Sequence, residues 1–152
     1  TADFGFVSLE EFCEALAVGM EYASSPEIAG PVLTQGGTLA LLLDNLRQRN
    51  VLRHVTSVIR GNALEVPLRS DYGVIFCDAV HSEYEINLTG PLLAKLARPG
   101  TWLICDDLHA DASLVRALQK YVQFDFLVLL GDIDPKNKAA VGRVRSTSTL
   151  AD

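Results

Sequence analysis

The stretch VIFCDAVHSEYE, residues 74–85, changes character half-way along its length. Its first four residues form an unbroken apolar run, which is typical of a strand buried on both faces. From Ser82 onward the residues are mostly polar and predict a solvated helix. Asp78 and His81 stand three residues apart at the junction. The stretch therefore predicts a strand that delivers an acid and a histidine to the start of a helix.

The same pattern returns downstream, where the apolar run WLIC leads directly into Asp106 and Asp107. Two further runs, HVTSVIR at residues 54–60 and FDFLVLLG at residues 124–131, predict additional strands. Helical segments at residues 83–97 and 112–122 separate the runs. Strands alternating with helices predict an α/β protein with a mostly parallel sheet and right-handed crossovers. The closing AAVGRVRS predicts a return strand, and hence a C-terminal antiparallel β-hairpin with FDFLVLLG.

The N-terminal part predicts helices. Ser8 and Glu11 form a capping box, and the apolar spacing that follows predicts an amphipathic helix over residues 9–23. SSPEIAGP predicts a loop, and a second helix is expected over residues 38–50, after the turn at Gly36 and Gly37. At 152 residues we expect a single domain, with an N-terminal helical segment at 1–25 and a core at 30–152.

Composition and charge narrow the class of function. The net charge of −6 argues against a general nucleic-acid binder, because that function needs clustered Lys and Arg. The three cysteines lie in apolar runs without metal-type spacing, which is typical of reduced thiols. No leader-type segment or run of about 20 apolar residues is visible. We therefore expect a cytoplasmic protein that binds a small molecule and neither nucleic acid nor membrane.

The carboxylates indicate chemistry if the two strands are neighbours. Ligands of a parallel α/β sheet bind beyond the carboxyl ends of its strands, which is where Asp78, Asp106 and Asp107 are expected. Three carboxylates brought together repel one another unless a cation neutralises them. Oxygen ligands suit Mg²⁺, Mn²⁺ or Ca²⁺. A histidine such as His81 can take a proton from a substrate hydroxyl at neutral pH.

Each of these residues also has an ordinary structural interpretation. Aspartates after strands commonly cap the next helix, as Asp78, Asp107 or Asp111 could do here. His81 and His109 could be solvent-facing loop residues. Together these residues are stronger evidence for a functional site than any one of them alone, because two predicted strands deliver carboxylates to the same end of one sheet.

At residues 74–108 the chain resembles a known family. VIFCDAVHSEYEINLTGPLLAKLARPGTWLICDDL is similar to the second half of class I S-adenosylmethionine-dependent methyltransferases, and particularly to the metal-dependent O-methyltransferases of the macrolide-sugar and catechol types. The sugar-modifying branch has an acid, two residues, a histidine and SY, then L-x-P-G-G and a strand ending in DD. This chain has DAVHSEYE, LARPGT and ICDD. The resemblance implies a Rossmann-like fold, with helices on both faces of the sheet. A homodimer is expected if the sheet edge beside HVTSVIR is unprotected.

The resemblance also implies roles for individual residues. Asp78, Asp106 and Asp107 would bind a divalent metal, expected to be Mg²⁺, and His81 would be the general base for a hydroxyl of a small-molecule substrate. The resemblance further implies three groups of residues that would bind S-adenosylmethionine. The turn at the predicted helix N-terminus would contribute Gln35, Gly36 and Gly37. The part of HVTSVIRGNALEVPL that meets the adenine would contribute Asn62 and Ala63, and the acid after the strand is Asp78.

The chain departs from the family pattern near residues 35–50. The family has a loop of the form E-x-G-x-x-x-G and a second strand ending in an acid, whereas this chain has only Gln35, Gly36 and Gly37. A segment is therefore missing here, or cofactor binding has been lost. The second case predicts a non-catalytic methyltransferase-like scaffold or dimerisation module that uses the exposed sheet edge beside HVTSVIR. A dinucleotide-binding enzyme is less favoured, because G-x-G-x-x-G and the P-loop motif are absent.

Overall fold

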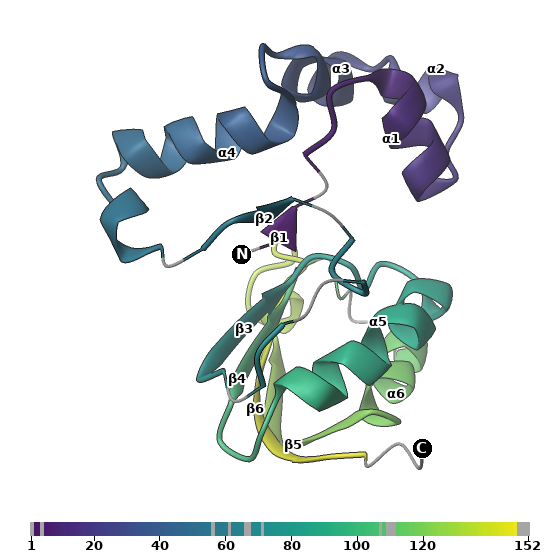
Figure 1. Ribbon diagram of the computed structural model, residues 1–152. Coiled ribbons are helices and arrows are strands. Elements are labelled where there is room, and N and C mark those ends of the chain that lie inside the picture. Colours follow the sequence, from purple (N-terminus) through teal and green to yellow (C-terminus); the bar gives the residue numbers. More distant parts are fainter. Residues whose placement is uncertain are drawn as a thin grey trace. The chain divides into compact units, whose positions relative to one another are not determined.

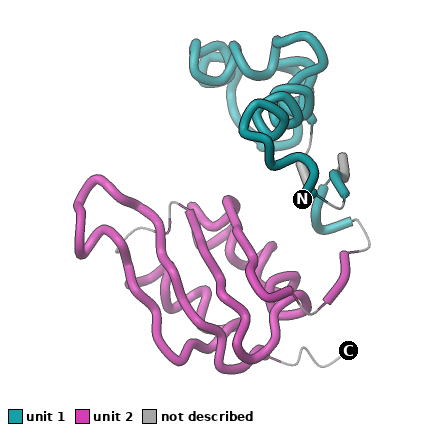
Figure 2. The backbone as a smooth tube through the Cα atoms, turned by 90° about the vertical axis from the view of Figure 1, so that its left-hand side faces the viewer, with its two compact units in different colours: residues 1–66 teal, residues 67–152 magenta. Residues whose placement is uncertain are grey.

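A computed structural model describes residues 2–3, 5–55, 57–60, 62–65, 68–70, 72–106, 108 and 112–148 (Figure 1). The chain divides into two compact units, residues 1–66 and residues 67–152 (Figure 2). Each unit is described by itself. None of the described helices is both long and apolar enough to cross a membrane.

Unit 1 is built mainly from helices: α1 (Leu9–Leu16), α2 (Met20–Ala23), α3 (Pro26–Leu33), α4 (Gly37–Gln48) and the short 3-10 turn η1 (Leu52–His54). The capping box predicted at the start of α1 is confirmed, because Ser8 Oγ accepts a hydrogen bond of 3.1 Å from the Glu11 N–H. The helix predicted over residues 9–23 is instead two helices. Ala17 adopts a left-handed conformation with a φ of 53° and ends α1.

The prediction of a loop at SSPEIAGP, residues 24–31, is wrong, because the segment from Pro26 onward forms α3. Pro26 occupies the first turn of this helix. At that position the N–H that proline lacks has no partner within the helix, and its fixed φ suits the helix. Phe6, Phe12, Ala23 and Val32 form the core of this unit, with the two phenylalanine rings edge to face at 5.1 Å.

The strand predicted over HVTSVIR is much shorter than expected. Among its described residues, only those of β2 (Ile59–Arg60) form a strand, which pairs in parallel with β1 (Ala2–Asp3) in a separate small sheet. His54 and Val55 instead donate their backbone N–H groups to Val51 and Leu52, at 2.9 and 3.0 Å. These turn bonds use donors that a longer strand would need for its neighbour.

Unit 2 contains a four-stranded sheet of β3 (Val74–Cys77), β4 (Trp102–Cys105), β5 (Val122–Leu129) and β6 (Ala140–Thr147). The strand order is β3-β4-β6-β5. The α/β class and the C-terminal antiparallel hairpin of β5 and β6 are confirmed. The sheet is mixed rather than mostly parallel: β3 and β4 run in parallel, whereas β6 is antiparallel to both of its neighbours. The reason is that the hairpin inserts its second strand beside β4.

Both helices of unit 2, α5 (Glu83–Leu96) and α6 (Ala112–Gln119), pack on the same face of this sheet (Figure 1). Side chains alternate between the two faces of each strand. Leu103 and Cys105 of β4, with Val144 of β6, therefore point into the core beneath the helices. Among the described residues of this unit, helices cover one face of the sheet, whereas they were expected on both.

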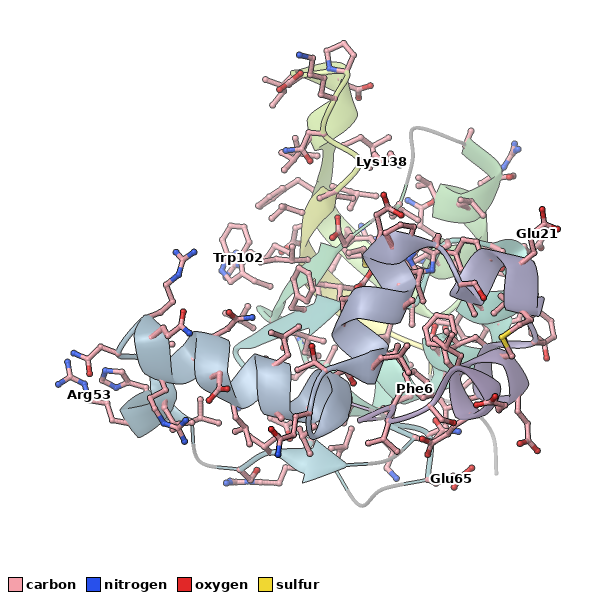
Figure 3. All side chains as sticks on the ribbon, turned by 90° about the horizontal axis from the view of Figure 1, so that it is seen from above. Phe6, Glu21, Arg53, Glu65, Trp102 and Lys138 are labelled. Atoms are coloured by element: carbon pink, nitrogen blue, oxygen red, sulfur yellow. The ribbon has the colours of Figure 1, made fainter. Side chains whose placement is uncertain are left out.

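The opposite face of the sheet, which we call the open face, carries large apolar side chains. Trp102, labelled in Figure 3, packs edge to face on Phe126 at 5.4 Å, and both rings remain more than 40% exposed. The open face consists of Val74, Phe76, Trp102, Phe126 and Val128. Apolar patches of this kind on a soluble protein commonly mark a contact surface.

Thr101 fixes the start of β3 and β4. Its side chain is 1% exposed, and its hydroxyl donates to the Tyr72 carbonyl at 2.6 Å and accepts from the Arg98 N–H at 3.1 Å. Its backbone carbonyl accepts from the Val144 N–H on β6 at 2.8 Å. One buried residue therefore holds together the segments before β3 and β4 and the middle of β6.

Candidate functional site

The parallel pairing of β3 and β4 places two of the predicted acids at the same edge. Cys77 and Cys105 are partners in the register, so Asp78 and Asp106 are the next residues on adjacent strands. The Asp106 N–H donates to the Cys77 carbonyl at 2.9 Å, which extends the ladder by one bond. Asp107 lies outside the described residues, as do His109 and Asp111.

His81 lies between two carboxylates just before α5. Its Nδ1 is 2.9 Å from Glu85 Oε2, and its Nε2 is 3.3 Å from Asp78 Oδ1. The side chain is 42% exposed, so solvent or a ligand can reach it. Because Asp78 follows β3 and Glu85 lies in the first turn of α5, the strand and the helix together set the orientation of the ring.

Glu85 is the member of this group that sequence reasoning missed. The N-cap Ser82 accepts from the Glu85 N–H at 3.2 Å, and Glu85 Oε2 accepts from the His81 backbone N–H at 2.7 Å. This is a capping box displaced by one residue, and its signal in the sequence was a serine followed three residues later by a glutamate. The helix start that orders Glu85 therefore also orders His81.

The described residues do not assemble the predicted metal site. They contain no group of three His, Cys, Asp or Glu side chains that could hold a metal ion. Asp78 pairs with His81, and Asp106 lies on an adjacent strand. The set of Asp78, Asp106 and Asp107 stays a prediction, because its third member lies outside the described residues.

Asp106 also forms one wall of a hollow of about 300 Å³, together with residues of the loop between β5 and β6. The remaining lining residues are Asp134, Lys136, Asn137 and Lys138. Sequence reasoning gave no role to this loop, DIDPKNK at residues 132–138. Its lysines gave no sign that they would meet the end of β4, because their position depends on the hairpin.

The residues predicted to bind the cofactor lie in both units, and those near α4 are engaged by their own chain. Gly36 and Gly37 have positive φ values of 85° and 69°. A Cβ at Gly37 would collide with the Phe6 carbonyl, which also accepts from the Thr38 N–H at 3.0 Å. The Gly37 N–H donates to Thr34. The glycines therefore have a packing role in unit 1, and a cofactor role for them and for Gln35 stays a prediction.

Asn62 and Ala63 lie in a turn after β2. Asn62 Oδ1 accepts from the Leu64 N–H at 3.0 Å, and its Nδ2 donates to Glu65 Oε1 at 3.2 Å. These bonds order the turn without a ligand. The predicted adenine contact stays a prediction.

Two thiols lie below the acidic edge. Burial raises the pKa of Cys77 above its ordinary value of 9.0, and the nearby Asp78 and Glu85 charges add to the rise. Burial also raises the pKa of Cys105. Both groups are therefore thiols, not thiolate nucleophiles, at neutral pH.

Comparisons with known proteins do not assign the chain to a family. No protein-family model matches it, and no curated protein matches it. Among solved structures it is similar to the crystal structure of the N-methyltransferase NodS from Bradyrhizobium japonicum WM9. The two are 10% identical, with a TM-score of 0.47, over 70% of this chain and 68% of that one. A similarity at this level carries no argument about activity.

Proposed function

We propose that this protein is an S-adenosylmethionine-dependent O-methyltransferase that acts on a hydroxyl of a small molecule. The observation that carries the proposal is His81, held between Asp78 and Glu85 at the carboxyl edge of a parallel strand pair. The residue pattern from Asp78 to Asp106, which resembles the metal-dependent O-methyltransferases, supports it.

The described residues support a base-assisted transfer. With Nδ1 donating to Glu85, neutral His81 presents Nε2 as its proton acceptor. His81 takes the hydroxyl proton while the hydroxyl oxygen bonds to the methyl carbon and the bond from that carbon to sulfur breaks. Asp78 and Glu85 offset the positive charge that the ring acquires. When bound, S-adenosylmethionine supplies a methyl group on a positively charged sulfur, and loss of that methyl group leaves the sulfur as a neutral thioether.

No step of this proposal depends on a metal. A divalent ion, predicted to be Mg²⁺ at Asp78, Asp106 and Asp107, would lower the pKa of the substrate hydroxyl. The cofactor contacts of individual residues stay predictions from the sequence. The cytoplasmic location stays an expectation from the sequence.

The test measures cofactor binding and methyl transfer separately. Titration calorimetry of the full chain with S-adenosylmethionine, with and without Mg²⁺, should show micromolar binding. His81→Ala should keep that binding but lower methyl transfer to a panel of hydroxylated acceptors by about 100- to 10,000-fold, as expected for loss of a general base. His54→Ala, a histidine in η1, is the matched control and should change neither.

Asp106→Asn should weaken any effect of Mg²⁺ if that carboxylate is a metal ligand. Failure of the wild-type chain to bind S-adenosylmethionine under both conditions would exclude the enzyme. Full methyl transfer by His81→Ala would refute its role as base.

The open face favours a second candidate, a non-catalytic methyltransferase-like scaffold that dimerises. Phe76 is 63% exposed there, and among the described residues β3 is an edge strand of its sheet. Such a face and edge suit association with a second copy of the chain. A stable dimer without cofactor binding would support this candidate over the enzyme.

A further inference from the structure

The hollow between the end of β4 and the hairpin loop has the composition of a binding site for a small charged molecule. Its volume of about 300 Å³ falls at the lower limit of ligand pockets. Every lining residue is polar or charged: Asp106 and Asp134 contribute carboxylates, Asn137 contributes an amide, and Lys136 and Lys138 contribute ammonium groups.

Hydrogen bonds order the loop that carries the lysines. Asp134 accepts twice, from the Lys136 N–H at its side chain (3.1 Å) and from the Asn137 N–H at its carbonyl (2.8 Å). Asn137 Oδ1 accepts from the Ala139 N–H at 3.0 Å. At the base of the loop, the Leu130 N–H donates to the Ala139 carbonyl at 2.9 Å. Among the described residues, the side-chain amide nitrogen of Asn137 has no hydrogen-bond acceptor, so it is available as a donor to a ligand.

The charges divide between the walls of the hollow. Asp106 comes from the strand edge, next to the strand end that carries Asp78, and the lysines come from the loop. The exposed Lys136 side chain forms no ion pair within the described part of the chain. A neutral sugar would form no ion pair with this ammonium, whereas a ligand with an anionic group would form a charge-assisted hydrogen bond with it. A hydroxyl on the same ligand would lie toward the carboxylates.

We propose that Lys136, Lys138 and Asn137 bind the anionic group, a carboxylate or a phosphate, of a hydroxylated acceptor. This inference rests on the proposed function and narrows its substrates to hydroxylated acids. The methylated hydroxyl would face the edge that carries Asp78 and Asp106. The hairpin loop then selects the substrate, while His81 performs the chemistry.

The inference is tested by NMR titration of the full chain without cofactor. The probes are glucuronate, glucose 6-phosphate and neutral glucose. We expect both anions to shift the backbone amides of Lys136, Asn137 and Lys138 and glucose to leave them unchanged. Tighter binding of one anion identifies the group that the loop prefers.

Lys136→Gln should weaken anion binding about three- to five-fold, the upper range for one exposed charge pair. Lys95→Gln, an exposed lysine on α5, removes the same charge elsewhere and is the matched control. Equal binding of glucose and glucuronate, or unchanged anion affinity in Lys136→Gln, would overturn the inference.

Failure of this inference and failure of the proposed function give different results. Cofactor binding without anion binding would overturn only the substrate class. Anion binding in a chain that never binds S-adenosylmethionine would exclude the methyltransferase but leave the hairpin loop as an anion site.

Discussion

Replacing Thr101 by valine should destabilise unit 2 without creating a cavity. Valine has nearly the same shape, so the packing of this buried side chain is kept. Two hydrogen bonds are lost, to the Tyr72 carbonyl and from the Arg98 N–H. Each is worth about 1 kcal/mol net, and each buried group left unsatisfied costs about 1–3 kcal/mol. We expect the free energy of unfolding to fall by about 2–4 kcal/mol.

Urea titration measures this loss, and the chain offers a selective probe. Trp102 is the sole tryptophan and lies on β4, next to Thr101, so its fluorescence reports the unfolding of unit 2. The transition midpoint should shift while its dependence on urea stays the same. Thr147→Val on β6 makes the same substitution at a half-buried position, where the hydroxyl has no hydrogen bond within the described residues. A loss below about 0.5 kcal/mol for Thr101→Val, or equal losses for the two variants, would refute the reasoning.

Two further predictions concern the thiols and the open face. The raised pKa values of Cys77 and Cys105 mean that the folded state favours the protonated thiols. Their contribution to stability is present below pH 9.0 and is lost as the pH rises further, so urea unfolding at increasing pH should show a decline that Cys105→Ala reduces. On the open face, Phe76→Glu should weaken self-association about 30-fold or more, as for a central interface residue. Sedimentation across a concentration series checks this, and a wild-type chain that stays monomeric throughout would contradict the predicted homodimer.

The local signals in the sequence predicted unit 2 well. Apolar runs ending in Asp78 and Asp106 became adjacent parallel strands, and the change to polar residues from Ser82 onward indicated the start of α5. These features depend on the apolar pattern, which is encoded within a few residues.

The features that were missed depend on other parts of the chain. Residue 17 adopts the left-handed conformation but is an alanine, not the glycine or asparagine that usually marks it. The sequence therefore did not indicate the break after α1. Pro26 can end one helix or begin the next, and the sequence alone did not decide between them. Lys136 and Lys138 line the same hollow as Asp106 only because the hairpin brings β6 against β4. The metal site of Asp78, Asp106 and Asp107 stays a prediction.

The strand order has a consequence for folding during synthesis on the ribosome. β6 is made after the other three strands of its sheet, yet it lies between β4 and β5. On the ribosome, β4 and β5 therefore each have a strand edge without a partner after they leave the exit tunnel and until β6 follows them. The sheet can close only after Thr147 has left the exit tunnel, so chaperones that shield apolar strands have their greatest opportunity in that interval.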